Sequence, residues 1–307
     1  MKKYKLLKNL VVLLILISFQ AQAQEKRLAL VIGNSSYEQD FLKNPVNDAL
    51  LISETLKSLG FDVILKTNIA NIKEFNDAVK EFGERRNLYN VGFIYYAGHA
   101  VQIDNINYLL ATTEEYKTDY DVTVNAFSVQ TMMRFLTDRS EEVNVLILDA
   151  CRDNPFEKNW IKTSRSSDGG GGLAKINPPT GSLIAYSTDP GNTAEDGDDK
   201  NSLYCMSLSK NMLLENTSLD QVFRNVRADV LAETNNKQRP VEATQLTGEA
   251  FYLKKSTYLK DIKVIDSLIE MEEYTLALVK ATSILTLDPN NMQALLRKGR
   301  ISYRTLN

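Results

Sequence analysis

Short apolar runs alternate with amphipathic segments along most of the chain. Residues 27–33, RLALVIG, predict a strand, and residues 47–60 carry apolar side chains three and four positions apart, which fits one face of a helix ended by Gly60. Runs that are apolar at successive positions are buried on both faces, which is typical of a mostly parallel sheet covered by helices. We therefore expect an α/β fold. Further strands are expected at 61–65, 91–98 and 143–149, and further helices at 71–86 and around 129–136.

The alternation breaks after residue 149. Residues 162–181 are rich in Ser, Gly and Pro and show no periodicity, which predicts an exposed, mobile loop. Order then resumes, so the sheet is expected to gain further strands. These later elements are a strand at 182–186, a loop over 187–202, helices near 203–214 and over 219–231, and a closing strand pair within 242–253.

From about residue 260 the pattern is helical only. Residues 273–303 resemble a tetratricopeptide repeat, with small residues such as Ala277, Ala281 and Ala294 where helices pack closely and LDPNN at the turn between them. The resemblance covers about one repeat, whereas a solenoid needs roughly three to be stable. A plain helical hairpin that caps the main domain is the alternative. We expect one domain over residues 24–255 and a small all-α segment over 260–307.

The first 23 residues differ from the rest. A basic start, a short apolar stretch and the small residues AQA ending at Ala23 predict a secretory signal, with an uncleaved N-terminal anchor as the alternative. The protein is then exported, to the periplasm or the outside, without a membrane segment after signal removal. Removal of residues 1–23 changes the formal net charge from −3 to −7, because this segment carries four lysines and no acidic residue. An acidic protein is a poor nucleic-acid binder but attracts basic substrates.

Two chemically reactive side chains each follow a predicted strand. His99, the only histidine, comes directly after the strand at 91–98, and Cys151 follows the strand at 143–149 by one intervening residue. In parallel α/β sheets, ligand-binding and catalytic residues lie at the carboxyl ends of the strands, so the two side chains are expected at one edge of the sheet. An imidazole can accept the thiol proton and later protonate a leaving amine, while the thiolate attacks a carbonyl. We therefore predict a His-Cys catalytic dyad.

Several runs in the right order resemble the caspase-like cysteine peptidases, specifically the bacterial metacaspase-like (orthocaspase) branch. They include YAGHAVQIDNINYLL, the step of 52 residues from His99 to Cys151, LILDACRDNPF, GSLIAYSTDPGNTAEDG and LDQVFRNVRADV. The resemblance spans about residues 27–253 and matches in part the caspase signature around the nucleophile. It implies a three-layer α/β/α sandwich with a mostly parallel sheet and the cleavage of peptide bonds.

The resemblance also implies a pocket for the substrate side chain before the scissile bond. Asp149 stands two residues before Cys151, where caspases have Gln, and would line this pocket with Asp48. Two carboxylates favour Arg or Lys and repel Asp, so cleavage after basic residues is expected. Asp196 is a third candidate wall of the pocket. The alternatives are a helix N-cap for Asp48 and a solvated strand end for Asp149.

The backbone amides of Ala100 and Cys151 would form the oxyanion hole. Most relatives have Gly at the position of Ala100, and the added methyl group could disturb a φ that Gly tolerates better. Ala97 stands where related enzymes often have Ser, which removes a hydroxyl group from the pocket but no charge.

Other features carry less information. Cys205 is best explained as a buried small apolar residue, and although one disulfide between the two cysteines can be drawn, we expect two free thiols. One histidine and two distant cysteines make no zinc site, and no cofactor is predicted. Calcium activates some relatives, but the acidic run at 195–199 is of a kind that is usually only solvated.

Two functions follow as hypotheses. The first is a secreted cysteine endopeptidase that cuts protein or peptide substrates after Arg or Lys, and that matures by self-cleavage at Lys162 or Arg165 in the predicted loop. The second is a catalytically weak binding or scaffold module that acts with its helical tail on a protein partner. The presence of both dyad residues favours the first.

Overall fold

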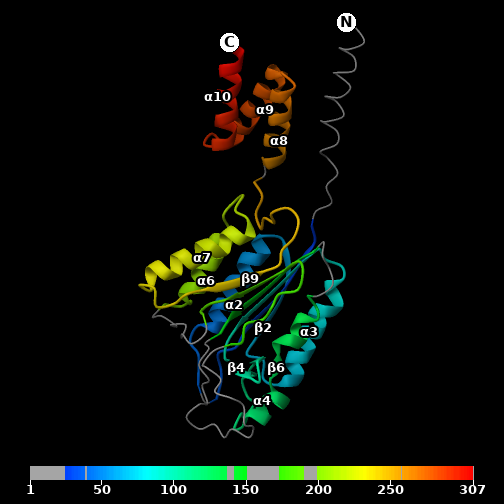
Figure 1. Ribbon diagram of the computed structural model, residues 1–307, viewed down its shortest axis with the longest axis vertical. Helices are drawn as coiled ribbons and strands as arrows, with labels where there is room; N and C mark the ends of the chain where they lie inside the picture. The colour runs from blue at the N-terminus through cyan, green and yellow to red at the C-terminus, as the bar shows by residue number, and fades with distance from the viewer. Residues whose placement is uncertain are drawn as a thin grey trace. The chain divides into compact units, whose positions relative to one another are not determined.

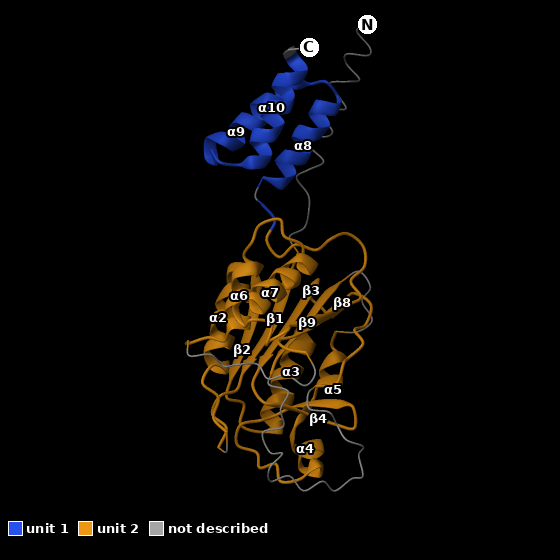
Figure 2. Cartoon of the chain, turned by 60° about the vertical axis from the view of Figure 1, so that its left-hand side comes forward, with its two compact units in different colours: residues 1–24, 255–307 blue, residues 25–254 orange. Residues whose placement is uncertain are grey.

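The computed structural model describes residues 25–38, 40–136, 142–150, 173–189, 199–256 and 258–306. Its contacts divide the chain into two units (Figure 2). The large unit comprises residues 25–254, and the described part of the second unit begins at Lys255. Each unit has a hydrophobic core of its own, and they are described separately.

A six-stranded sheet forms the centre of the large unit. Its strand order is β2-β1-β3-β7-β8-β9, and all neighbours are parallel except the last pair, in which β9 runs antiparallel to β8. The predicted mostly parallel sheet is thus confirmed, with an antiparallel strand at one edge. The strands are β1 (Arg27–Gly33), β2 (Phe61–Thr67), β3 (Val91–Ala97), β7 (Val143–Asp149), β8 (Ser182–Tyr186) and β9 (Val241–Thr244).

Helices cover both faces of this sheet, which gives the expected three layers (Figure 1). Along each central strand alternate side chains enter opposite cores: Leu30 belongs to one and Val31 to the other, and neither is exposed. Burial on both faces explains why the strands are apolar at successive positions. One face is covered by α2 (Pro45–Ser58), α6 (Leu203–Met212) and α7 (Leu219–Glu233), and the other by α3 (Ile72–Arg86) and α5 (Val129–Met133).

A second, antiparallel sheet lies directly after β3. It contains β4 (Ala100–Ile103), β5 (Ile106–Leu109) and β6 (Phe127–Ser128), and the short helix α4 (Asp119–Asn125) precedes β6. Asp104 and Asn105 join β4 to β5, and both have positive φ angles, as a tight two-residue hairpin requires. This hairpin was not predicted, because its turn carries Asp-Asn and lacks the glycine that usually marks a two-residue turn.

Two expectations about the later part of the large unit were confirmed only in part, since one strand of the expected pair forms and residues 173–181 form neither helix nor strand. Residues 242–253 do not form a strand pair: β9 ends at Thr244, and Leu246, Phe251 and Leu253 then pack onto the helix-covered core without a ladder. The loop predicted over residues 162–181 is not exposed throughout, since Leu173 and Ala174 are buried. Residues 162–172 lie outside the described ranges.

The side chain of Asn107 explains the order at Ala174. Its amide nitrogen donates to the Ala174 carbonyl at 2.8 Å, and its oxygen accepts from the Ala174 N–H at 2.7 Å. One buried side chain therefore takes the place of a strand partner and satisfies both backbone groups.

In the second unit, the described residues from 255 onward form three helices around one small core. They are α8 (Leu259–Glu270), α9 (Tyr274–Leu287) and α10 (Met292–Leu306). Ala277, Ala281 and Ala294 are fully buried in this core, where their small size lets the helices approach. No helix within the described ranges is both long and apolar enough to cross a bilayer.

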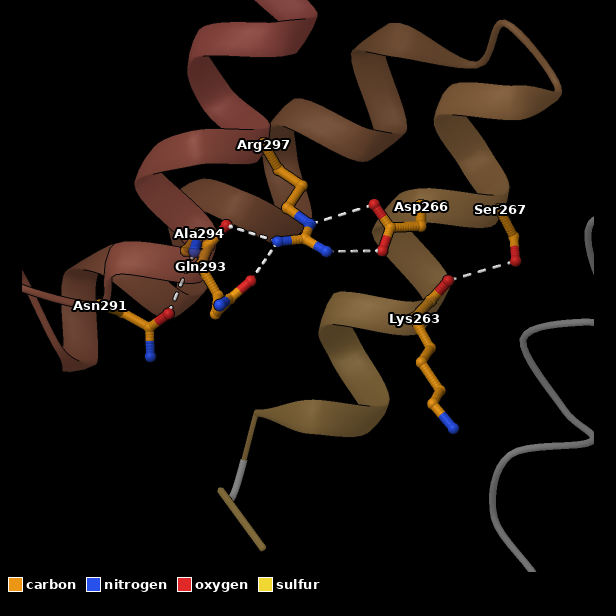
Figure 3. A network of polar contacts seen from close by, with 7 residues as sticks. All are labelled: Lys263, Asp266, Ser267, Asn291, Gln293, Ala294 and Arg297. Atoms are coloured by element: carbon orange, nitrogen blue, oxygen red, sulfur yellow. Dashed lines mark hydrogen bonds and ion pairs between the residues drawn. The ribbon is translucent and has the colours of Figure 1, made fainter. Parts of the chain in front are cut away.

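A polar network ties α10 to α8 (Figure 3). The Arg297 guanidinium makes two parallel bonds to the Asp266 carboxylate, at 3.0 and 2.9 Å, and also contacts Gln293. The Asn291 side chain accepts from the Ala294 N–H at 3.0 Å and so caps the start of α10. A two-pronged ion pair of this kind fixes the orientation of the two helices.

Candidate active site

The carboxyl ends of the central strands meet at one edge of the sheet. In the parallel register Gly33 pairs with Ala97, and Ala97 with Asp149, so β1, β3 and β7 end level with one another. The Gly98 N–H approaches the Asp149 carbonyl at 3.4 Å, which continues the pairing one step beyond the strands. His99 is therefore two residues past a position that pairs with Asp149. It lies at this edge, as predicted.

Gly98 makes the turn into His99 possible. Its φ of 151° lies in a region that side-chain-bearing residues rarely adopt, and a Cβ there would come within 2.6 Å of the Tyr37 hydroxyl and 2.8 Å of the Tyr96 hydroxyl. These hydroxyls occupy that space because they bind the backbone of His99. A larger residue at position 98 would displace them.

Two buried tyrosines hold the His99 backbone. The His99 N–H donates to the Tyr37 hydroxyl at 2.9 Å, and the Tyr96 hydroxyl donates to the His99 carbonyl at 2.6 Å. The Tyr37 hydroxyl also reaches the Leu110 carbonyl at 3.3 Å, so it is inserted between two backbone groups that would otherwise pair directly. The position of the imidazole is thus set by side chains that come from two different parts of the chain.

The His99 ring faces Asp40 through one nitrogen. Nε2 lies 2.9 Å from the Asp40 carbonyl oxygen and 3.3 Å from a carboxylate oxygen of the same residue. Both partners are acceptors, so Nε2 carries the proton in the neutral ring and Nδ1 is the basic nitrogen. The Tyr37 ring packs against the imidazole, with centroids 4.5 Å apart. In this arrangement Nδ1 is the ring nitrogen that carries a lone pair in the neutral imidazole.

A cavity of about 350 Å³ opens beside His99. Its walls come from the segment that follows β1 and from the segment that follows β5. The lining residues are Tyr37, Glu38, Asp40, His99, Thr112, Thr113, Glu114, Glu115 and Tyr116.

Ala100 is the first residue of β4. The Leu110 N–H bonds to the His99 carbonyl at 3.1 Å, and the next pair of residues is Ala100 with Leu109. Hydrogen-bonded and non-bonded pairs alternate in an antiparallel ladder, so the Ala100 N–H points away from β5. Its methyl group is buried in the core and its φ is not left-handed, so the side chain costs this backbone nothing.

Asp48 and Asp149 lie together, and both are buried. Asp48 is inside α2, where Asn44 holds the N-cap position, so the alternative of an N-cap role for Asp48 was wrong. Asp149 accepts from the buried Tyr95 hydroxyl at 2.8 Å and is not a solvated strand end. Ser202 contacts both carboxylates, which places them within reach of a single residue.

Burial changes the protonation of this pair. It raises the pKa of Asp149 to about 7, and the neighbouring charge of Asp48 adds to the shift. Burial raises the pKa of Asp48 as well, although hydrogen bonds from Asn201 and Ser202 oppose the change. A cation that binds beside two buried acidic groups is stabilised by them, because its positive charge favours the ionised form of both carboxylates.

The remaining predicted site residues have different outcomes. Cys151, Asp196, Lys162 and Arg165 lie outside the described residues, as does the N-terminal segment 1–23. Cys205 is a fully buried free thiol in the core, as expected, and burial raises its pKa well above the usual value, so it is a poor nucleophile. Within the described ranges no three His, Cys, Asp or Glu side chains gather as metal ligands.

Sequence reasoning missed the residues that position the site. Tyr95 and Tyr96 belong to an apolar strand, and the hydrogen-bond partners of their hydroxyl groups cannot be read from the neighbouring sequence. Tyr37, Asp40 and Ser202 are distant in sequence from His99 and Asp149, and no local pattern marks them. A buried strand with two consecutive tyrosines that ends at Gly-His is the one signal that pointed to hydroxyl groups at this edge.

Comparison with known proteins agrees with this geometry. The family model described as the caspase domain matches residues 26–251. The crystal structure of caspase-1 from Spodoptera frugiperda superposes with a TM-score of 0.54 at 16% identity, over 78% of this chain and 94% of that one. The structure described as pro-sf-caspase-1 gives 0.55 at 16% identity, over 76% and 93%. At this identity the two structures show a shared fold.

Two curated relatives match over a shorter stretch. They are mucosa-associated lymphoid tissue lymphoma translocation protein 1 of Homo sapiens and its homolog of Mus musculus, each 29% identical over 136 residues. The match takes 43% of this chain and 16% of the length of each relative. Because the family model spans nearly the whole large unit and the solved caspase structures share its fold, the chain belongs to the caspase domain family.

Proposed function

We propose that the protein is a cysteine endopeptidase in which Cys151 is the nucleophile and His99 the acid and base. One observation carries the proposal: β3 and β7 end in register, and His99 and Cys151 each follow their paired residue by two positions. The orientation of the imidazole supports it, since the proton on Nε2 leaves Nδ1 as the base.

The proposed reaction has two steps, formation of a thioester and its hydrolysis. His99 Nδ1 accepts the Cys151 thiol proton, and the sulfur attacks the scissile carbonyl to form a tetrahedral oxyanion. The backbone amides of Ala100 and Cys151 are proposed to bind this oxygen. When the C–N bond breaks, His99 returns the proton to the leaving amine and a thioester remains. Water, deprotonated by His99, hydrolyses the thioester and regenerates the thiol.

The proposed specificity is for Arg or Lys before the scissile bond. Asp48 and Asp149 form a buried acidic pair at the edge where Cys151 follows Ala150, and a guanidinium or ammonium group stabilises its ionised form. An Asp side chain would add a third like charge. Asp196 is proposed as an additional acidic wall. This preference and the Asp at the second position before the cysteine are the grounds for assigning the chain to the metacaspase-like branch.

The rest of the chain suggests where and with what the enzyme acts. Residues 1–23 are proposed as a secretory signal, so the protein acts in the periplasm or outside the cell. The helical unit is proposed as tetratricopeptide-like and as a contact for a protein partner, because α9 and α10 expose large apolar side chains such as Val279, Leu287 and Leu296.

A panel of fluorogenic peptides with Arg, Lys or Asp before the reporter tests the proposal. Wild type is expected to release the reporter after Arg and Lys but not after Asp, and Cys151→Ala and His99→Ala are expected to be inactive. The panel is run with and without calcium. Turnover that persists in Cys151→Ala would overturn the role of Cys151 as the nucleophile. The absence of turnover in wild type under every condition would overturn the enzymatic function and leave the scaffold hypothesis. Turnover after Asp would refute the acidic pocket instead.

Self-processing is tested separately by intact-protein mass spectrometry. Wild type is expected to show cleavage after Lys162 or Arg165, and Cys151→Ala none. An intact chain in active wild type, or equal cleavage in the variant, contradicts self-cleavage.

A further inference from the structure

Hydrogen-bond donors from β3 and from the two residues that precede the first turn of α6 hold the carboxylate pair. Tyr95 on β3 donates to Oδ2 of Asp149 at 2.8 Å, and the Ser202 hydroxyl donates to the same oxygen at 3.3 Å. Oδ1 of Asp48 accepts from the Ser202 N–H at 3.0 Å and from the Asn201 amide at 2.8 Å. These four donors use one oxygen of each carboxylate.

Ser202 has the central place among these donors. It is the N-cap of α6, and its oxygen accepts from the Cys205 N–H at 3.1 Å. The same residue therefore holds the start of α6, the carboxylate on β7 and the carboxylate on α2. All of its contacts are buried, and in such surroundings a hydrogen bond to an ionised group is at its strongest.

We propose that Ser202 and Tyr95 are specificity-positioning residues that hold Asp48 and Asp149 ionised and correctly oriented for the basic side chain of a substrate. This inference rests on the proposed function and assigns residues outside the dyad and the acidic pair. Donors to the charged form favour ionisation, so they oppose the effect of burial on the two carboxylates. Without them the pair would bind a proton in preference to a guanidinium.

Other titratable groups around the pair are accounted for. Tyr95 comes from β3, and Tyr204 and Cys205 come from α6; burial raises the pKa of all three well above their usual values, so they stay neutral near pH 7. Asp149, whose pKa burial raises to about 7, is thus the described group at this site that is expected to titrate in this range, and burial raises the pKa of Asp48 as well.

Kinetics of cleavage after Arg, measured from pH 5.5 to 9, test the inference in Ser202→Ala. Loss of a hydrogen bond to a charged group predicts a fall in kcat/KM of about 10-fold or more, carried mainly by KM. Loss of the donor is also expected to raise the pKa of the carboxylates and so to shift the acidic limb of the pH profile to higher pH. This shift is the decisive measurement, because a variant that only loosens the helix would leave the pH profile unchanged. Ser202→Thr retains the hydroxyl group and is expected to restore both values.

Matched controls separate this role from a structural one. Ser218→Ala removes the same kind of N-cap from α7, where the Ser218 hydroxyl accepts from the Gln221 N–H and bonds to none of the described carboxylates. Tyr95→Phe is compared with Tyr204→Phe, whose hydroxyl has no hydrogen-bond partner among the described residues. Ser218→Ala and Tyr204→Phe are expected to keep the wild-type pH profile, whereas Tyr95→Phe shifts it as Ser202→Ala does.

The outcomes distinguish the inference from the function on which it rests. An inactive wild type refutes the proposed function. An active wild type whose preference for Arg and pH profile are unchanged in Ser202→Ala and Tyr95→Phe refutes the inference alone. An equal loss of activity in Ser202→Ala and Ser218→Ala, with no pH shift, reduces Ser202 to a helix cap and also refutes it.

Discussion

Single hydroxyl groups decide the geometry at the edge of the sheet. The Tyr37 hydroxyl accepts from the His99 N–H and lies beside the Tyr96 hydroxyl, which donates to the His99 carbonyl. Buried backbone groups must find partners, and here phenol oxygens serve where a regular strand pair would otherwise form. The ring of His99 is therefore held through its own main chain as well as through Asp40.

Tyr37→Phe is expected to lower kcat by about 10-fold with little change in KM, and to destabilise the fold by about 1–3 kcal/mol, because the buried His99 N–H loses its acceptor. Peptide kinetics and urea unfolding measure the two effects. Tyr116→Phe is the control, since its hydroxyl binds the backbone of Ala111 and not that of His99. Equal kinetic losses in both variants would contradict the role of Tyr37.

The raised pKa of Asp149 predicts how stability depends on pH. Its folded-state pKa of about 7 is above its usual value of 3.8, so this group contributes stability that is fully present below pH 4 and is lost as the pH rises through 7. Asp149→Asn removes the ionisation. The variant is expected to gain on the order of 2 kcal/mol over wild type between pH 5 and pH 8. Urea unfolding at both pH values tests this, and a constant difference would contradict it.

The positions of the main strands and helices could be predicted from the sequence, whereas the ends of loops and the small antiparallel sheet could not. Strands such as β1 and β7 were predictable because burial on both faces leaves an uninterrupted apolar run. The expected edge position of His99 came from the same rule, whereas the pocket position of Asp149 was implied by the resemblance to the caspase-like peptidases. The β4–β5 hairpin was missed, and the end of the loop at Ala174 was misjudged, because a single buried side chain, that of Asn107, supplies the partners. Such pairing between distant residues has no local pattern.

Asn107→Ala is predicted to release the segment that begins at Leu173. Hydrogen exchange at Ala174, followed by mass spectrometry, is expected to accelerate at least about 10-fold, since the variant removes the acceptor of that amide and the donor to its carbonyl. Asn76→Ala is the matched control, because Asn76 is exposed and its amide donates only within α3. Unchanged exchange at Ala174 would show that other contacts hold the segment.

At the scale of the whole molecule, the chain combines a caspase domain with a helical unit that has a core of its own. Separate cores predict separate unfolding. A variant that ends at Lys254 is expected to retain its fold, with kcat/KM for a short Arg peptide within about 2-fold of the full chain. Circular dichroism and kinetics test this, and loss of the folded state on truncation would contradict the independence of the two units.

In the proposed mechanism, a cysteine after β7 attacks substrates that are selected by a buried acidic pair. The most direct test is mass spectrometry of the protein after reaction with an irreversible peptidyl ketone that carries Arg beside the reactive carbon. We predict one adduct per chain, on Cys151, with none on Cys205, greatly slowed labelling in His99→Ala, and no reaction with the corresponding Asp reagent. Labelling of Cys205 instead, equal labelling by the Asp reagent, or labelling that is independent of His99 would contradict the account.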